Sequence, residues 1–83
     1  MNDWISRPDI ASALDGILLS DKDAIIGILR GRGIEPVSIT TVGGDALGGA
    51  EIQAKAGEKD VCVDLRCYCG VWTVRVDVHG DKS

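Results

Sequence analysis

The second half of the chain alternates apolar and polar residues with a period of two, and this pattern constrains the fold most strongly. The alternation covers residues 61–68 and 71–78, and side chains two positions apart on a strand share one face. With Cys69-Gly70 as the turn, apolar residues lie opposite apolar ones and Asp64 lies opposite Arg75. Such pairs stabilise antiparallel strands, so the pattern predicts a β-hairpin in this register.

Two further segments upstream read as strands. Residues 37–42 are β-branched through their centre, and residues 50–56 alternate small apolar residues with polar ones. If residues 57–60 form a four-residue loop, the core positions match again and Glu51 lies opposite Arg66. We therefore expect four strands in an antiparallel meander.

The first half of the chain has the three-to-four-residue spacing of helices. Residues 6–9 and 20–23 each place an acid three positions after a serine, as helix starts do. The first helix is expected to run to about Leu19, and the second to stop near Gly31. Apolar residues at helical spacing mark the first helix: Ile10, Leu14, Ile17 and Leu18.

Two helices followed by four strands predict an α+β fold, with the order ααββββ and both helices packed on one face of the meander. At 83 residues the chain is expected to form one small globular domain over residues 1–83. Residues 1–5 and 80–83 are expected to be frayed at its ends.

The three cysteines and the single histidine raise the question of a metal site. Cys67 and Cys69 share one strand face while Cys62 lies on the other, so three thiols cannot converge on one ion. A structural zinc site needs four ligands, and we therefore expect no metal. Cys67 is expected to pack on Trp72 as a small apolar side chain.

No catalytic or cofactor-binding motif is present, and we expect the protein not to be an enzyme. Cys62, His79 and Asp77 invite comparison with a cysteine nucleophile and its base, but such a site also needs a pocket to exclude water, and neighbours on an open strand face are more often solvated. The glycine-rich residues 42–49 lack the Gly-Lys-Ser/Thr ending of a phosphate loop and are expected to form a mobile hairpin loop. Leu47 at its tip either folds back onto the domain or anchors a partner.

The charge and the apolar content of the chain exclude some classes of function. The net charge is −4, and the first 24 residues hold five of the acids against Arg7 and Lys22. This acidity disfavours direct binding to nucleic acid, and the chain has no apolar run of membrane-spanning length. The N-terminal residues lack the basic and apolar regions of a secretory signal, so a cytoplasmic location is expected, the host cytoplasm if the gene is phage-encoded.

What remains is an interaction protein. We expect an inhibitor or regulator that occupies a basic, nucleic-acid-binding surface of a larger protein or ribonucleoprotein complex. Phage and mobile-element inhibitors such as anti-CRISPR proteins share this size and charge class, although no motif connects this chain to them. The candidate partner-binding residues are Asp3, Asp9, Asp15, Asp21, Asp23, Leu47 and the outward-facing Tyr68.

The alternative is an intracellular regulatory or subunit module with an apolar contact, made through an edge strand or a homodimer face. Residues 37–42 carry no charge that would deter pairing with another strand. An acidic contact should weaken as salt rises, whereas an apolar one should change little.

Overall fold

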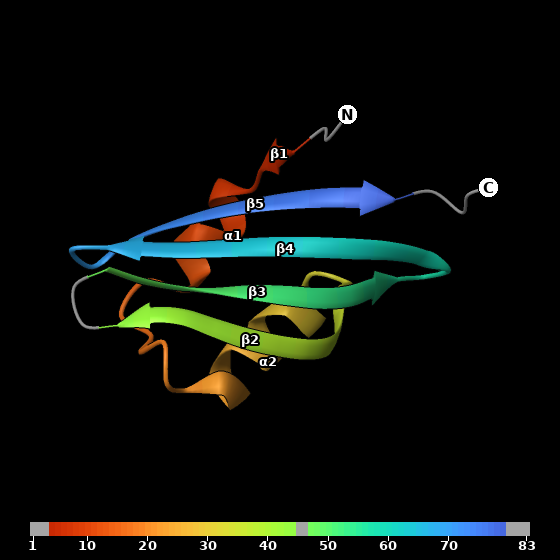
Figure 1. Ribbon diagram of the computed structural model, residues 1–83. Helices are drawn as coiled ribbons and strands as arrows, with labels where there is room; N and C mark the ends of the chain where they lie inside the picture. Colours follow the sequence, from red (N-terminus) through yellow and green to blue (C-terminus); the bar gives the residue numbers. More distant parts are fainter. Residues whose placement is uncertain (1–3, 45–46, 80–83) are drawn as a thin grey trace.

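The computed structural model describes residues 4–44 and 47–79, and for Gly44 and Leu47 it describes the backbone alone. A five-stranded antiparallel sheet lies in front of two helices in Figure 1. The elements are β1 (Ile5–Ser6), α1 (Pro8–Ala13), α2 (Lys22–Gly31), β2 (Glu35–Gly44), β3 (Leu47–Ala56), β4 (Lys59–Tyr68) and β5 (Val71–His79). The α+β class and the antiparallel sheet are confirmed.

Helix α1 is shorter than the sequence predicts. It begins with Pro8 after the N-cap residue Arg7 and ends at Ala13, instead of running to Leu19. Gly16 has a φ of 81°, which is outside the right-handed helical region and suits glycine. Leu18 is consequently 71% exposed, so its assignment to the buried helix face was wrong.

Helix α2 follows the prediction more closely. Its N-cap is Asp21 instead of Ser20, and the Asp21 carboxylate accepts a hydrogen bond from the Ala24 N–H at 3.3 Å. At the other end, Gly33 takes a φ of 82° and the Ile34 N–H donates to the Leu29 carbonyl at 3.0 Å. This glycine-dependent cap turns the chain from the helix into β2.

The strands lie in the order β1-β5-β4-β3-β2. The fifth strand, β1, was not predicted: Ile5 pairs with Val76 and Ser6 pairs with Arg75. Ile5 therefore belongs to the sheet and not to a frayed end, whereas residues 1–3 and 80–83 lie outside the described residues. Strand β2 forms the opposite edge of the sheet.

One predicted hairpin register is confirmed and the other is wrong. In the β4–β5 hairpin, Asp64 pairs with Arg75 and Cys67 pairs with Trp72, as expected. In the β3–β4 hairpin, the turn is shorter than expected and Glu51 lies opposite Asp64 instead of Arg66. The error is two residues, so every side chain keeps its predicted face and the predicted core is retained.

The glycine-rich segment continues the β2–β3 ladder. Val42 pairs with Gly49 and Gly44 pairs with Leu47, so most of the segment expected to be a loop is strand. A register shift between Pro36 and Ser38 places a bulge near the start of β2.

The core lies between the sheet and the helices. Ile10 and Leu14 from the first helical region and Ile25 and Leu29 from α2 are fully buried. They meet the apolar residues of the sheet that alternate with polar ones, including Leu65. Helix α1 packs on β5 and α2 packs on β2, so both cover the same face. No helix in the described ranges is long and apolar enough to span a membrane.

Candidate functional site on the open face of the sheet

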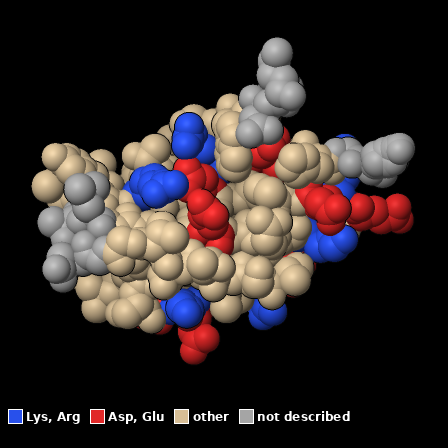
Figure 2. All heavy atoms as spheres, in the orientation of Figure 1, with Lys and Arg blue, Asp and Glu red and all other residues tan. Residues whose placement is uncertain are grey.

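No helix or strand within residues 4–44 and 47–79 covers the face of the sheet turned away from the helices. We call this surface the open face, and Figure 2 shows it in the orientation of Figure 1. Basic and acidic side chains lie close together near its middle, within largely uncharged surroundings. The side chains that form its centre come from the polar positions of β3, β4 and β5, with Trp4 beside them.

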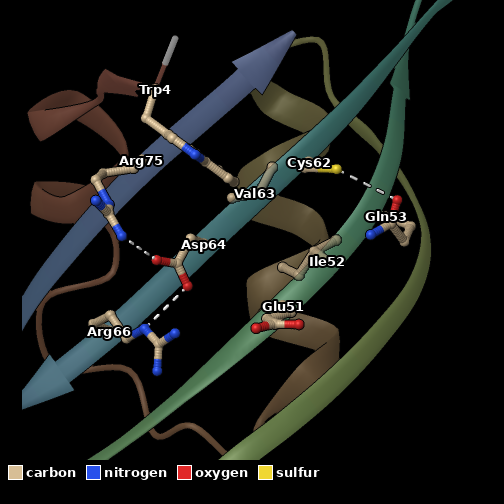
Figure 3. Close-up of a pocket in the computed structure, with 9 residues that line it drawn as sticks. All are labelled: Trp4, Glu51, Ile52, Gln53, Cys62, Val63, Asp64, Arg66 and Arg75. Carbon is tan, nitrogen blue, oxygen red and sulfur yellow. Dashed lines mark hydrogen bonds and ion pairs between the residues drawn. The ribbon is translucent and has the colours of Figure 1, made fainter. Parts of the chain in front are cut away.

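A buried carboxylate holds two arginines at the centre of the open face. The side chain of Asp64 is only 8% exposed, whereas those of Arg66 and Arg75 are 52% and 51% exposed. Arg66 donates from Nε to Asp64 Oδ1 at 3.0 Å, and Arg75 donates from Nη2 to Asp64 Oδ2 at 2.8 Å. Figure 3 shows both guanidinium groups directed at this carboxylate. We call these three residues the Asp64 cluster.

The side chains of the Asp64 cluster hold one another in place, because both arginines donate hydrogen bonds to the same carboxylate. Charge-assisted hydrogen bonds are shorter and stronger than neutral ones, and burial of the acceptor lowers the screening by water. Arg66 lies two residues from Asp64 on the same strand, and Arg75 lies directly opposite on β5. The hydrogen bonds to Asp64 therefore orient both guanidinium groups, while about half of each arginine side chain stays exposed.

Trp4 extends the cluster toward the edge of the sheet. The guanidinium carbon of Arg75 lies 5.6 Å from the centroid of the Trp4 ring, within the range of a cation–π contact. Trp4, the Asp64 cluster and the polar side chains of β3 line a cavity of about 330 Å³. Glu51 and Gln53 form the β3 side of this cavity.

Gly49 allows Arg66 to lie across the sheet. Gly49 pairs with Arg66, and a Cβ at Gly49 would overlap the carbonyl oxygen of Leu65 and lie 3.2 Å from Arg66 Cδ. A larger residue at this position would displace the arginine or the backbone of β4.

A second polar group, made by Cys62, Asp77 and His79, lies beside the first. Cys62 Sγ is 3.7 Å from His79 Nε2 and 3.5 Å from Gln53 Oε1. His79 Nε2 is also 3.2 Å from Asp77 Oδ2, and the Asp77 side chain is 8% exposed. These residues contact one another as their sequence positions suggested.

Their geometry does not match a cysteine-protease type of relay. In such a relay, one ring nitrogen of the histidine takes the thiol proton and the other donates to the orienting acid. Here the same nitrogen, Nε2, faces both the thiol and the carboxylate. If Nε2 carries a proton and donates it to the Asp77 carboxylate, that nitrogen cannot also accept the thiol proton of Cys62. In the part of the chain that the structure describes, no three His, Cys, Asp or Glu residues are placed to hold a metal ion.

The acids predicted to contact a partner differ in their surroundings. Asp9 is paired with Arg7 at 3.0 Å, and Arg32 lies 4.0 Å from the same carboxylate oxygen. Asp15, Asp21 and Asp23 are exposed and make no ion pair within residues 4–44 and 47–79. Asp3 lies outside the described residues. The acids that are open to a partner therefore border α2 more than α1.

Tyr68 and Leu47 meet at the other end of the open face. Tyr68 is 61% exposed, as expected, and lines a small cavity of about 190 Å³ together with Val42 and Arg66. The backbone of Leu47 pairs with that of Tyr68. The side chain of Leu47 lies outside the described residues, so both of its predicted roles stay predictions.

The sequence did not predict two contacts of this site, that of Arg66 with Asp64 and that of Trp4 with Arg75. Arg66 was assigned to Glu51, and Trp4 was placed in a frayed terminus. The signal for Arg66 was the Asp-x-Arg spacing of Asp64 and Arg66, which puts both side chains on one face of one strand. Trp4 carried no periodic signal because β1 is only two residues long.

Comparisons of this chain with protein-family models, with curated proteins and with solved structures found no match.

Proposed function

We propose that this protein is a protein-binding module that acts by covering a surface of a larger partner, and that the open face is its main contact. The observation that carries the proposal is the Asp64 cluster, which fixes two half-exposed arginines at the middle of an uncovered sheet.

The composition of the open face supports a protein contact. Tryptophan, tyrosine and arginine dominate the energetics of protein interfaces, and Trp4, Tyr68, Arg66 and Arg75 all lie on this face. Arginines held in place before binding lose less side-chain entropy on binding. The free guanidinium edges suit carboxylates or backbone carbonyls of a partner, while Glu51 suits a nearby cation.

The test is capture of a partner from an extract of the native host, identified by mass spectrometry, followed by affinity measurement with the purified partner. We expect Trp4→Ala and Arg75→Ala to weaken binding at least about tenfold, as loss of central aromatic and arginine residues does. Arg30→Ala is the matched control, because Arg30 is 60% exposed and belongs to α2, which lies behind the sheet. Unchanged affinity in both open-face variants, with folding intact by circular dichroism, would rule the open face out.

A second candidate contact is the acidic surface at Asp15, Asp21 and Asp23. Its support is that these exposed carboxylates have no ion-pair partner in the described part of the chain. Binding of this surface to a basic, nucleic-acid-binding region of a larger complex is the anti-defence type of inhibition, and it implies a cytoplasmic protein.

Changing the charge of these residues tests the acidic contact while the cap of α2 is kept. Asp15→Lys and Asp23→Lys change exposed positions, while Asp21→Ser keeps a capping oxygen for the Ala24 N–H. We expect the triple variant to bind a basic partner more weakly and to lose most of the salt dependence of binding. If the triple variant binds the partner as tightly as the wild type does, these acids do not make the contact.

A further inference from the structure

The two edges of the sheet differ in how they are protected. The β5 edge is covered at its middle by β1, and the Arg7 N–H donates to the Val74 carbonyl at 2.8 Å. Asp77 and His79 add polar and ionisable side chains farther along that strand. These features are the usual ways in which proteins prevent unwanted strand pairing.

The β2 edge has such protection only at its start. Pro36 and the bulge before Ser38 interrupt its first residues. From Ser38 to Gly44 the strand contains no charged residue and no proline, and it pairs regularly with β3. The outward-facing backbone groups of this segment have no other described strand beside them, because β2 is the last strand in the sheet order.

We propose that this edge pairs with the same edge of a second copy of the chain, forming a two-fold dimer with one continuous sheet. In an antiparallel pairing centred on Thr40, Thr40 lies beside Thr40 of the second copy and Ser38 lies opposite Val42. Each side chain then meets one on its own face of the sheet. The pairs consist of β-branched and hydroxyl residues, which stabilise neighbouring strands.

The surface next to the β2 edge supports a second copy as the occupant. A groove of about 240 Å³ runs between α2 and β2 and is lined mainly by the apolar residues Ile26, Pro36, Val37 and Ile39. Val37 is 67% exposed. A two-fold axis perpendicular to the sheet places both α2 helices on the same side, and in this register the β2 side of each groove lies beside residues 41–43 of the other copy.

Electrostatics also favours self-association at this edge over the rest of the surface. A chain with a net charge of −4 repels its own copy. The segment from Ser38 to Gly44 is a stretch of surface that adds no charge to either side of a dimer. The dimer uses the β2 edge and not the Asp64 cluster or Trp4. A failure of dimerisation therefore leaves the proposed function unaffected, and the reverse also holds.

The first test is sedimentation equilibrium over a wide range of concentrations. We expect the wild-type chain to dimerise and Thr40→Lys to raise the dissociation constant at least tenfold, because two lysines would face each other on the axis. Thr73→Lys is the matched control: Thr73 is also an exposed strand residue, but it lies on β5. A wild-type protein that stays monomeric at all concentrations, or a dimer unaffected by Thr40→Lys, overturns the proposal.

The second test locates the contact by disulfide trapping. In a Cys69→Ser background, which removes the exposed native thiol, Thr40→Cys should yield a disulfide-linked dimer under mild oxidation. Glu51→Cys, on the neighbouring strand β3 and away from the axis, should yield little. Equal cross-linking of the two variants contradicts pairing at the β2 edge.

Discussion

The Asp9 carboxylate has a pKa lowered to about 2, mainly because the Arg7 side chain donates hydrogen bonds to it. The folded protein therefore holds Asp9 ionised at a pH where the unfolded chain, with a value near 3.8, begins to protonate. The contribution of this pair to stability is present above about pH 3.8 and is lost as the pH falls toward 2.

Carbon-13 NMR titration of the Asp9 carboxyl group tests this assignment. We expect Arg7→Ala to raise the Asp9 pKa from about 2 toward 3.8, because the first and largest cause of the shift is removed. Arg30→Ala, which removes the partner of Glu35, should leave Asp9 unchanged. An Asp9 pKa that stays at about 2 in Arg7→Ala would assign the shift to another neighbour.

Gly49 and Gly27 are predicted to respond oppositely to alanine. Gly49→Ala would force a Cβ against the Leu65 carbonyl, a backbone atom that cannot move aside. We expect a loss of about 1–3 kcal/mol in the free energy of unfolding. Gly27→Ala lies in α2 with nothing within 4 Å of the new Cβ and should gain up to about 1 kcal/mol. Urea denaturation measures both, and a neutral Gly49→Ala would contradict the close approach.

The β4–β5 turn places a cysteine where asparagine is usual. Cys69 has a φ of 53° and Gly70 a φ of 81°, so both central residues of this two-residue turn are left-handed. We expect Cys69→Asn to stabilise the hairpin by up to about 1 kcal/mol and Cys69→Val to destabilise it, because β-branched residues tolerate this conformation poorly. Thermal unfolding of the two variants checks the order, and a more stable valine variant would be inconsistent with this turn.

At the level of strands, the sequence predicted which face of the sheet each side chain lies on better than it predicted which residues pair across neighbouring strands. The β4–β5 register was correct because Cys69-Gly70 allows only a tight turn between two clearly alternating segments. The β3–β4 register failed because Gly57 adopts a φ of 67° and closes a shorter turn than the four residues expected. A shift of two residues preserves the alternation, so sequence pattern alone cannot detect it.

The candidate site was predictable only where strand pairing determined it. The Asp64 to Arg75 contact followed from the correct hairpin, whereas the Arg66 contact was missed with the wrong one. The Trp4 contact depends on β1, whose two residues are too few to show a period. Helix α1 was overextended because apolar residues continue at helical spacing beyond the point where Gly16 leaves the helix.

Across the whole molecule, protection against amide hydrogen exchange should follow position in the sheet. Strands β3 and β4 have hydrogen-bonded neighbouring strands on both sides. Strand β1 is two residues long and has a neighbouring strand on one side only. We expect Val63 and Leu65 to exchange only through global unfolding and Ile5 to exchange far faster. NMR-detected exchange measures this, and equal protection of Ile5 and Val63 would contradict the sheet order.

The buried side chain of Asp64 has a consequence for how the protein can evolve. Along β4, open-face positions such as Arg66 are exposed, but Asp64 is nearly as buried as the core residues beside it. A saturation mutational scan should therefore show tolerance alternating along β4, with Asp64 as an intolerant exception. Because one carboxylate accepts hydrogen bonds from two guanidinium groups, substitutions at Asp64, Arg66 and Arg75 should be correlated among sequences that descend from this chain.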